Sequence, residues 1–508
     1  MGSKKILMTV AAVAASFLCA APLKMEWKAT QTPAPESVAR PYAGLLGDKM
    51  VVAGGSTYEA TKAYSATVSV YDTKADTWAK VGTLPKGVAE GASVAINLGT
   101  AVNPDWRLIC VGGVTADGAS SQAFLLSADG KTEALPPCPY GTLSMTAATA
   151  WDGGAVFACG ILDGKLTNRI FTLKRVNGEW TWGELPALPG VPRAQAVAAA
   201  QNGDQKSMIL VVYGGAVTAE DGQSMADVKG WGYTKNFDGN WEWKALEDAP
   251  VATIGATFQA IGDQHMLLVG GYNRQMWDRV SRMLPEDRER MFGEAPAAFN
   301  WNRTVYAYHA VTGKWTEYGE LPADVLPRCG AATALIPAAG KVMPKVVIAG
   351  GEVKPKVRTN VAHVVSFERQ NWSFSWVSWV VIGVYFLAMV GMAMIFVLRQ
   401  KTADSYFRGG KSIPWFVAGM SIFATMLSSI TFISIPTMTY IGDWRYFPMV
   451  LCILAMAPIA IFFYLPFFCR LNITSAYEYL EKRFNLAIRL FGSAVFNIFM
   501  VCRVAVVT

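Results

Sequence analysis

Short runs of aliphatic and β-branched residues, each ending in a glycine pair, recur through the first two thirds of the chain. Such apolar runs, bounded by Gly, predict buried β-strands. A pair of glycines lets the strand end turn sharply and lets a neighbouring backbone approach closely. The pairs are Gly54-Gly55, Gly112-Gly113, Gly214-Gly215, Gly270-Gly271 and Gly350-Gly351, and a degenerate copy ending in Cys159-Gly160 fills the one gap in the spacing.

A tryptophan followed by Leu-Pro marks the outer edge of several units, at Trp78, Trp182 and Trp315. The period of roughly 50 residues resembles that of kelch repeats, each of which is a four-stranded blade of a β-propeller. Six copies imply an all-β, six-bladed ring, whose strand edges are protected if it closes. The last unit lacks an outer strand, and Glu26-Trp27-Lys28 matches the missing one. We therefore expect residues near Trp27 to complete the last blade.

The interval between the last two glycine pairs is too long for one blade. Its excess, Arg274 to Asn300, is polar, rich in Glu and Arg, and has helical spacing. We expect this insertion to project from one face of the propeller as a lid.

Long apolar segments replace this pattern after about residue 370. Three segments are long enough to span a bilayer, and a fourth begins near Leu490: Trp376 to Leu398, Ile413 to Tyr440 and Phe447 to Phe468. Basic residues flank alternate loops, which predicts that those loops are cytoplasmic and that the propeller lies outside. The C-terminal part is thus expected to be α-helical and to contact the lipid bilayer.

The N-terminus has the features of a secretory signal peptide. Lys4 and Lys5 precede an apolar stretch from Ile6 to Leu18, and small residues follow it. We therefore divide the chain into a signal peptide (1–21), a propeller (22–370) and a membrane part (371–508). Export of the propeller to the periplasm agrees with the charge pattern of the membrane loops.

Composition excludes two classes of ligand, nucleic acids and metal ions, from the expected partners of the propeller. The net charge of +7 is not gathered into basic runs with interleaved aromatics, so nucleic-acid binding is not expected. With three histidines and no paired cysteine spacing, the propeller is expected to hold no metal or other cofactor. Cys110, Cys138, Cys159 and Cys329 are interpreted as small buried hydrophobes.

The membrane part resembles the sodium:solute symporter family. The resemblance is carried by residues 404–415 and 474–484 and by the Ser/Thr-rich second span, and it covers the chain after residue 376. It implies a broken-helix, inverted-repeat fold and a sodium ion as coupling ion. Because that family has many more than four helices, the sequence is expected to hold only an opening part, which cannot transport alone.

Four residues of the second span fall at helical spacing on one face: Ala424, Leu427, Ser428 and Thr431. The resemblance implies that the carbonyl groups of Ala424 and Leu427 bind sodium, and that Ser428 and Thr431 meet a substrate carboxylate. The alternative is that the hydroxyl groups only aid helix packing. Arg503 lies in the fourth apolar segment, where a charge is costly, so we expect an anionic partner. That partner is the substrate carboxylate or an acidic residue of another helix.

The propeller resembles the N-acetylneuraminate mutarotases, also called epimerases, in a circularly permuted subgroup. Residues 351–359 are similar to their active-site loop, and residues 192–196 also fit. Mutarotation needs a group that removes the anomeric hydroxyl proton and protonates the ring oxygen. We assign Glu352 as this acid/base and Arg358 as the clamp for the sugar carboxylate. The alternative is a surface salt bridge on a charged loop.

Three more arginines stand where inner strands begin, namely Arg40, Arg193 and Arg328. We expect them to ring one mouth of the channel and to bind an anionic substrate. The alternative is that arginine at this place is common to kelch repeats in general.

The expected function is a periplasmic sialic acid mutarotase fused to a sodium-coupled symporter in a bacterial inner membrane, which the chain crosses several times. The alternative is a non-catalytic kelch module, which binds a ligand or partner, on a symporter for another sugar acid or sugar.

Overall fold

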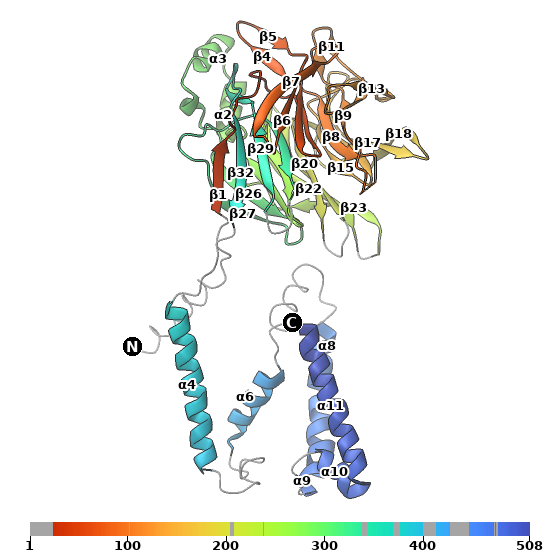
Figure 1. Ribbon diagram of the computed structural model, residues 1–508, viewed down its shortest axis with the longest axis vertical. Helices are drawn as coiled ribbons and strands as arrows, with labels where there is room; N and C mark the ends of the chain where they lie inside the picture. Colours follow the sequence, from red (N-terminus) through yellow and green to blue (C-terminus); the bar gives the residue numbers. More distant parts are fainter. Residues whose placement is uncertain are drawn as a thin grey trace. The chain divides into compact units, whose positions relative to one another are not determined.

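The computed structural model describes residues 24–100, 102–203, 208–236, 238–337, 343–368, 376–399, 413–426, 447–471, 473 and 476–507. It divides into two compact units, Met1–Gln370 and Asn371–Thr508 (Figure 1). The predicted signal peptide lies outside the described residues.

The first unit is a β-propeller-like assembly of antiparallel sheets (Figure 1). Four of its sheets have four strands each. The first two consist of β2 (Tyr42–Leu46), β3 (Lys49–Ala53), β6 (Thr67–Asp72) and β7 (Thr77–Thr83), and of β8 (Ala92–Asn97), β9 (Trp106–Val111), β12 (Ala123–Leu126) and β13 (Thr132–Leu135). The other two consist of β24 (Thr257–Ile261), β25 (His265–Val269), β26 (Thr304–His309) and β27 (Lys314–Glu320), and of β28 (Ala332–Ile336), β29 (Lys345–Ala349), β32 (Ala362–Glu368) and β1 (Lys24–Ala29).

A ten-stranded sheet contains two further antiparallel runs of four strands. The first run is β15 (Ala147–Trp151), β16 (Gly154–Leu162), β17 (Lys165–Val176) and β18 (Glu179–Leu185), and the second is β20 (Val197–Asn202), β21 (Met208–Thr218), β22 (Ser224–Lys235) and β23 (Trp241–Leu246). Two short strands, β14 (Leu143–Ser144) and β19 (Arg193–Ala194), add to this sheet; β19 pairs with both β17 and β21 and so joins the two runs.

In most blades the glycine pair directly follows the second strand, as the sequence pattern predicts. In the blade that contains β21 the pair lies within that strand and bends it. The first glycine of each pair has a φ between +56° and +70°, and the second has a φ between +93° and +106°. The degenerate copy keeps this geometry, with Cys159 at φ +61° and Gly160 at φ +107°. Few residues other than Gly adopt such angles, so the backbone requires the same turn even where the side chain differs.

The N-terminal strand completes the last sheet, which confirms the expectation for Trp27. Strand β1 pairs antiparallel with β32, and Trp27 lies opposite Val365. The first and last described strands of the propeller-like unit are therefore held together by backbone hydrogen bonds, and β1 covers an edge that β32 would otherwise expose.

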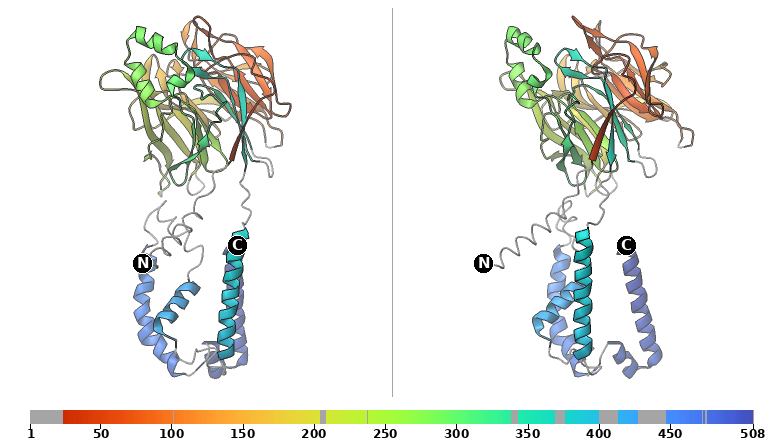
Figure 2. Two further views of the ribbon diagram at one scale, coloured as in Figure 1. Left: turned by 90° about the vertical axis from the view of Figure 1, so that its left-hand side faces the viewer. Right: turned by 60° about the vertical axis from the view of Figure 1, so that its left-hand side comes forward.

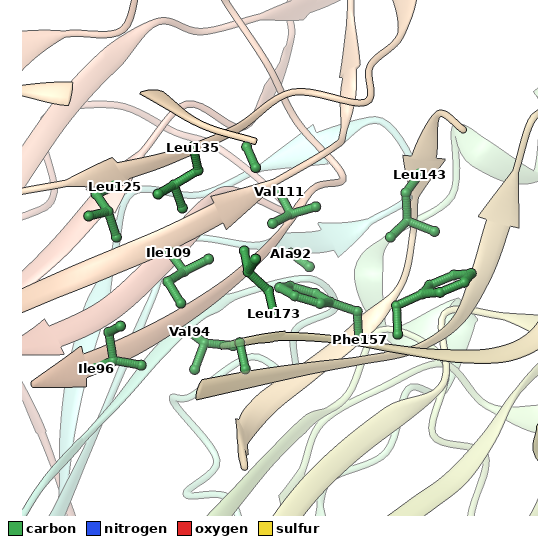
Figure 3. Packing of buried hydrophobic residues seen from close by; sticks show 13 residues of the cluster. Ala92, Val94, Ile96, Ile109, Val111, Leu125, Leu135, Leu143, Phe157 and Leu173 are labelled. Atoms are coloured by element: carbon green, nitrogen blue, oxygen red, sulfur yellow. The ribbon is translucent and has the colours of Figure 1, made fainter. Parts of the chain in front are cut away.

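Apolar side chains fill the space between successive sheets. In the cluster shown in Figure 3, Val94 and Ile109 come from one sheet, and Phe157 and Leu173 come from the run that follows it. Full burial of such a side chain contributes roughly 1.5–3 kcal/mol. The four described cysteines of this unit, Cys110, Cys138, Cys159 and Cys329, are also buried and unpaired, as expected of small hydrophobes.

Replacing Gly112 with alanine is expected to lower the free energy of unfolding by about 3 kcal/mol or more. Its φ is +68°, and an added Cβ would lie 2.0 Å from the carbonyl oxygen of Leu143. Gly118→Ala is the control, because φ there is +117° but no atom lies within 4 Å of the added Cβ. Chemical denaturation should show a loss of only about 1 kcal/mol for the control; equal losses would contradict the steric argument.

The polar insertion is helical, as predicted. It forms α2 (Arg274–Ser281), α3 (Pro285–Phe292) and the short 3₁₀ helix η2 (Pro296–Phe299). Figure 2 shows these green helices at one edge of the strands. Asn273 caps α2 by accepting a hydrogen bond from the backbone N–H of Met276.

All regular elements among the described residues of the second unit are helices. Its helices are α4 (Trp376–Arg399), α6 (Trp415–Met426), α8 (Phe447–Ile459), the π-helix η5 (Ala460–Tyr464), α9 (Leu465–Arg470), α10 (Ala476–Arg483) and α11 (Leu486–Val507). Among the described residues, one helix is both long and apolar enough to cross a bilayer, over Trp376–Ile395. Shorter apolar helices cover Trp415–Ala424, Leu454–Arg470 and Leu486–Cys502.

Candidate functional site

Glu352 and Arg358 lie opposite each other on a short hairpin that follows the last glycine pair. The hairpin consists of β30 (Glu352–Lys354) and β31 (Val357–Arg358). Nη1 of Arg358 lies 2.5 Å from Oε1 of Glu352, and the two side chains are 9% and 10% exposed. The pair is therefore an ion pair, as the alternative supposed, but a buried one and not a surface salt bridge.

The Glu352 carboxylate accepts two further hydrogen bonds. The backbone N–H of Lys356 donates to Oε1 over 2.8 Å, and the hydroxyl of Tyr272 donates to Oε2 over 3.0 Å. Burial first, and then the nearby Glu352, raise the pKa of Tyr272 well above its ordinary value. Tyr272 therefore stays protonated and remains a donor, so both carboxylate oxygens are held in fixed directions.

The residues around Glu352 occupy the same position in three different blades, each of which contains one four-stranded sheet of the first unit. Ser56, Tyr272 and Glu352 each come directly after a glycine pair. Nη2 of Arg358 lies 3.5 Å from Oγ of Ser56. The three blades are neighbours, because strands β25 and β29 share one apolar cluster and strands β29 and β3 share another. The site thus lies where the first and last parts of the propeller-like chain meet.

One edge of the Arg358 guanidinium lacks a strong partner. Its Nη1 binds Glu352, its Nη2 makes only the long contact with Ser56, and its buried Nε has no partner. The ring of Tyr58 lies 5.8 Å from the guanidinium carbon. A planar edge with two N–H donors fits a carboxylate in bidentate fashion, and buried donors rarely stay unpaired. This edge can therefore accept a ligand carboxylate while Nη1 still binds Glu352.

Backbone hydrogen bonds also join successive blades of the first unit. In each blade a residue that lies two positions before the innermost long strand has a positive φ between +49° and +66°: Arg40, Glu90, Met145, Gln195, Gly255 and Gly330. Five N–H to carbonyl bonds of 2.7–2.9 Å join them in the sequence Gln195 to Met145, Met145 to Glu90, Glu90 to Arg40, Arg40 to Gly330 and Gly330 to Gly255. We call these six the axial residues, since their bonds pass from one blade to the next.

Two axial side chains contact Arg40, and a lysine pairs with one of them. Its Nη2 donates to Oε1 of Gln195 over 2.6 Å, and its Nη1 lies 3.7 Å from Oε1 of Glu90. Glu90 also pairs with Lys62 at 2.5 Å. Burial opposes the charge on Arg40, yet Tyr272, Glu90 and Glu352 raise its pKa above the ordinary value. Arg40 therefore remains cationic between two carboxylates.

Gly330 makes room for this arrangement. A Cβ on Gly330 would lie 2.6 Å from Cγ of Arg40, and φ there is +60°. The absence of a side chain on Gly330 therefore allows the Arg40 side chain to lie across it.

Arg193 and Arg328 bind partners other than those of Arg40, and the expectation that all three line one mouth stays a prediction. Arg193 is 1% exposed and pairs with Asp227 at 2.9 Å. Arg328 is buried, and it contacts the carbonyl oxygens of Gly350 and Val361 and Nδ1 of His363. Both lie two positions before an axial residue, whereas Arg40 is itself axial. Their guanidinium groups hold their own blades together, as the alternative from kelch repeats implies.

The helical insertion contacts the hairpin that carries Glu352. Nζ of Lys354 donates to the carbonyl oxygens of Gly293 and Glu294, and Nζ of Lys356 pairs with Glu289 of α3. The insertion is therefore attached to the hairpin through two lysines.

The predicted residues of the membrane part are only partly described. Ala424 lies near the end of α6 and is exposed within its unit. Arg503 lies on α11. Leu427, Ser428 and Thr431 lie outside the described residues.

Sequence reasoning missed Ser56, Tyr272, Lys62, Glu90 and Gln195. Ser56 and Tyr272 could have been found from the position directly after each glycine pair, since Glu352 occupies that position in the last unit. Glu90 and Gln195 stand at an axial position that carries Gly in other units, so no shared residue type identifies it.

Comparison with known families agrees with this division of the chain. Residues 155–384 match the family model of N-acetylneuraminate epimerase, residues 43–85 match the kelch motif, and residues 406–507 match the sodium:solute symporter family. The last of these matches lies within the helical second unit.

Individual relatives divide in the same way. A sodium/sialic acid symporter of Proteus mirabilis (strain HI4320) is 48% identical over 135 residues, covering 27% of this chain and 27% of the relative. The N-acetylneuraminate epimerase of Vibrio cholerae serotype O1 (strain ATCC 39315 / El Tor Inaba N16961) is 28% identical over 201 residues, covering 37% and 48%. The corresponding epimerase of Vibrio vulnificus (strain YJ016) is 26% identical, covering 32% and 44%.

The chain spans between about a quarter and about half of the length of these relatives. Its two parts match different proteins, and each match falls within one of the two compact units except at residues 371–384. The chain therefore joins a kelch region similar to N-acetylneuraminate epimerases to a region similar to the sodium:solute symporter family.

Proposed function

We propose that the kelch region is a periplasmic mutarotase that interconverts the anomers of N-acetylneuraminate beside a sodium-coupled carrier for the same sugar acid. The buried pair of Glu352 and Arg358 carries this proposal. In this pair, hydrogen bonds fix the orientation of the Glu352 carboxylate, and the Arg358 guanidinium keeps N–H donors that lack a strong partner.

The chemistry needs one proton acceptor and one proton donor. Glu352 takes the proton from the anomeric hydroxyl as the bond between the anomeric carbon and the ring oxygen breaks, and it gives a proton to that oxygen. Rotation in the open-chain ketone followed by the reverse steps closes the ring on the other face. Arg358 holds the sugar carboxylate through Nε and Nη2, and the cation Arg40 adds to the positive potential of the site.

The fold suits this role if six blades form a closed ring. Four separate sheets and the two runs of the ten-stranded sheet account for six units, and five hydrogen bonds join their axial residues. In this proposal the propeller ends near residue 370. The substrate enters the propeller beside Arg40. Arg193 and Arg328 support the blades near the site without touching the substrate.

The membrane part supplies import. By its similarity to the symporter family, the carbonyl groups of Ala424 and Leu427 are proposed to bind sodium, and Ser428, Thr431 and Arg503 are proposed to meet the substrate carboxylate. The basic loops favour a propeller in the periplasm of a bacterial inner membrane. Sialidases release one anomer, so conversion beside the carrier raises the local supply of the other.

The test is anomer exchange measured by NMR on freshly released α-N-acetylneuraminate. The purified full chain in detergent is expected to speed the approach to anomeric equilibrium well above the rate in buffer. A heat-denatured sample is the control for catalysis by detergent or contaminants. Exchange at the buffer rate would reject the mutarotase, and binding of the sugar without exchange would support a non-catalytic binding module.

A further inference from the structure

A cavity of about 270 Å³ lies between the helical insertion and the propeller-like unit. Its walls are mainly aromatic and aliphatic: Met276, Trp277, Val280, Phe292, Phe299 and Trp301. The volume is somewhat below the roughly 300–1,000 Å³ of pockets that bind whole drug-sized ligands. The cavity therefore has ample room for one substituent of a sugar acid.

The cavity adjoins the Glu352 site through two residues. Tyr272 lines the cavity and also donates its hydroxyl to Oε2 of Glu352. Pro355 lines it from the turn between β30 and β31, the hairpin that carries Glu352 and Arg358. A ligand whose reacting carbon lies at Glu352 can therefore place a neighbouring group in the cavity.

Two buried donors on the cavity wall have no partner. Nε1 of Trp301 and Nε of Arg288 make no hydrogen bond, although Trp301 is only 2% exposed. Unpaired buried N–H groups are uncommon and destabilising, so an acceptor that enters the cavity and reaches either donor would be stabilised there. No carboxylate belongs to the described lining, which disfavours a cationic group.

We infer that this cavity binds the acylamino group of the sugar acid, with its carbonyl oxygen accepting from Trp301 or Arg288 and its methyl group against the aromatic wall. This inference rests on the proposed mutarotase function and deepens it. An acylamino group combines one acceptor with an apolar end, which is the combination that the lining offers. A hydroxyl in its place leaves the apolar wall empty.

The test compares N-acetylneuraminate with its deaminated analogue, which carries a hydroxyl in place of the acetamido group. Val280→Phe fills the cavity, and Gln275→Phe is the matched control, because Gln275 is exposed on the same helix. Val280→Phe is expected to raise the half-saturating concentration for N-acetylneuraminate about tenfold, while leaving the analogue within twofold. Gln275→Phe should change neither sugar.

A second variant guards against misfolding. Trp301→Phe keeps an aromatic ring but removes the unpaired donor, and it is expected to weaken N-acetylneuraminate about fivefold, again without affecting the analogue. Equal effects of Val280→Phe or Trp301→Phe on both sugars, in variants with unchanged thermal unfolding, would overturn the inference.

Calorimetric binding of both sugars to the same proteins separates this inference from the proposed function. Selective loss of N-acetylneuraminate binding without any anomer exchange in the wild type would reject catalysis and keep the subsite. Exchange with no selectivity between the sugars in any variant would reject the subsite and keep catalysis. Absence of binding by the wild-type chain would overturn both.

Discussion

Replacing Glu352 with glutamine is expected to slow anomer exchange by roughly 10²- to 10⁴-fold, the range that a positioned acid/base contributes. The amide keeps the size of the side chain and an oxygen that can accept from Tyr272 or Lys356. It cannot take up a proton from the anomeric hydroxyl. NMR exchange rates at saturating sugar measure the effect on the chemical step itself.

Glu289→Gln is the matched control for this prediction. Glu289 is a carboxylate on α3 that pairs with Lys356 of the same hairpin, but it is 62% exposed. Its loss is expected to change the exchange rate by less than twofold. If both variants kept wild-type rates while the wild type was active, Glu352 would not be the acid/base, and Glu90 would become the next carboxylate to replace.

Replacing Arg358 with methionine is expected to weaken binding of N-acetylneuraminate by roughly 10- to 100-fold. The variant loses a charge-assisted bidentate contact with the sugar carboxylate, and such contacts are about twice as strong as neutral hydrogen bonds. It also leaves Glu352 without its partner ion, so the catalytic rate should fall as well. Arg358→Lys keeps the charge but not the planar edge. Compared with Arg358→Met, it should recover more of the exchange rate than of the affinity for N-acetylneuraminate.

The methyl ester of the sugar separates these two effects. The wild type should prefer the free acid over the ester, and Arg358→Met should lose most of that preference. Should Arg358→Met retain the full preference for the free acid, Arg358 would serve only to position Glu352, and Arg40 would be the remaining cation for the carboxylate.

Much of the propeller-like unit could be predicted because most repeats contain a glycine pair, and glycine adopts backbone angles that other residues rarely adopt. The glycine pairs located the units, and Cys159 was recognised as a degenerate glycine that still has φ +61°. Trp27 was correctly paired with the last unit because that unit lacked an outer strand. These features depend on local sequence, which is why they could be recognised without the structure.

The surroundings of Glu352 depend on which units are neighbours in space. Tyr272 and Ser56 reach the ion pair from the two flanking units, and nothing near residue 352 in the sequence indicates them. A shift of two positions along the chain separates axial Arg40 from buried Arg193 and Arg328, and the sequence analysis treated the three as equivalent. Such a shift decides whether a side chain enters the site or packs inside its blade.

Pairing of β1 with β32 has a consequence for biogenesis. A contact between the first and last strands has a very long sequence separation, and contacts of this kind form late and slowly. The last sheet cannot gain its outer strand until residue 368 has left the ribosome and reached the same compartment as residue 24. Completion of the last sheet should therefore lag behind synthesis of the other sheets.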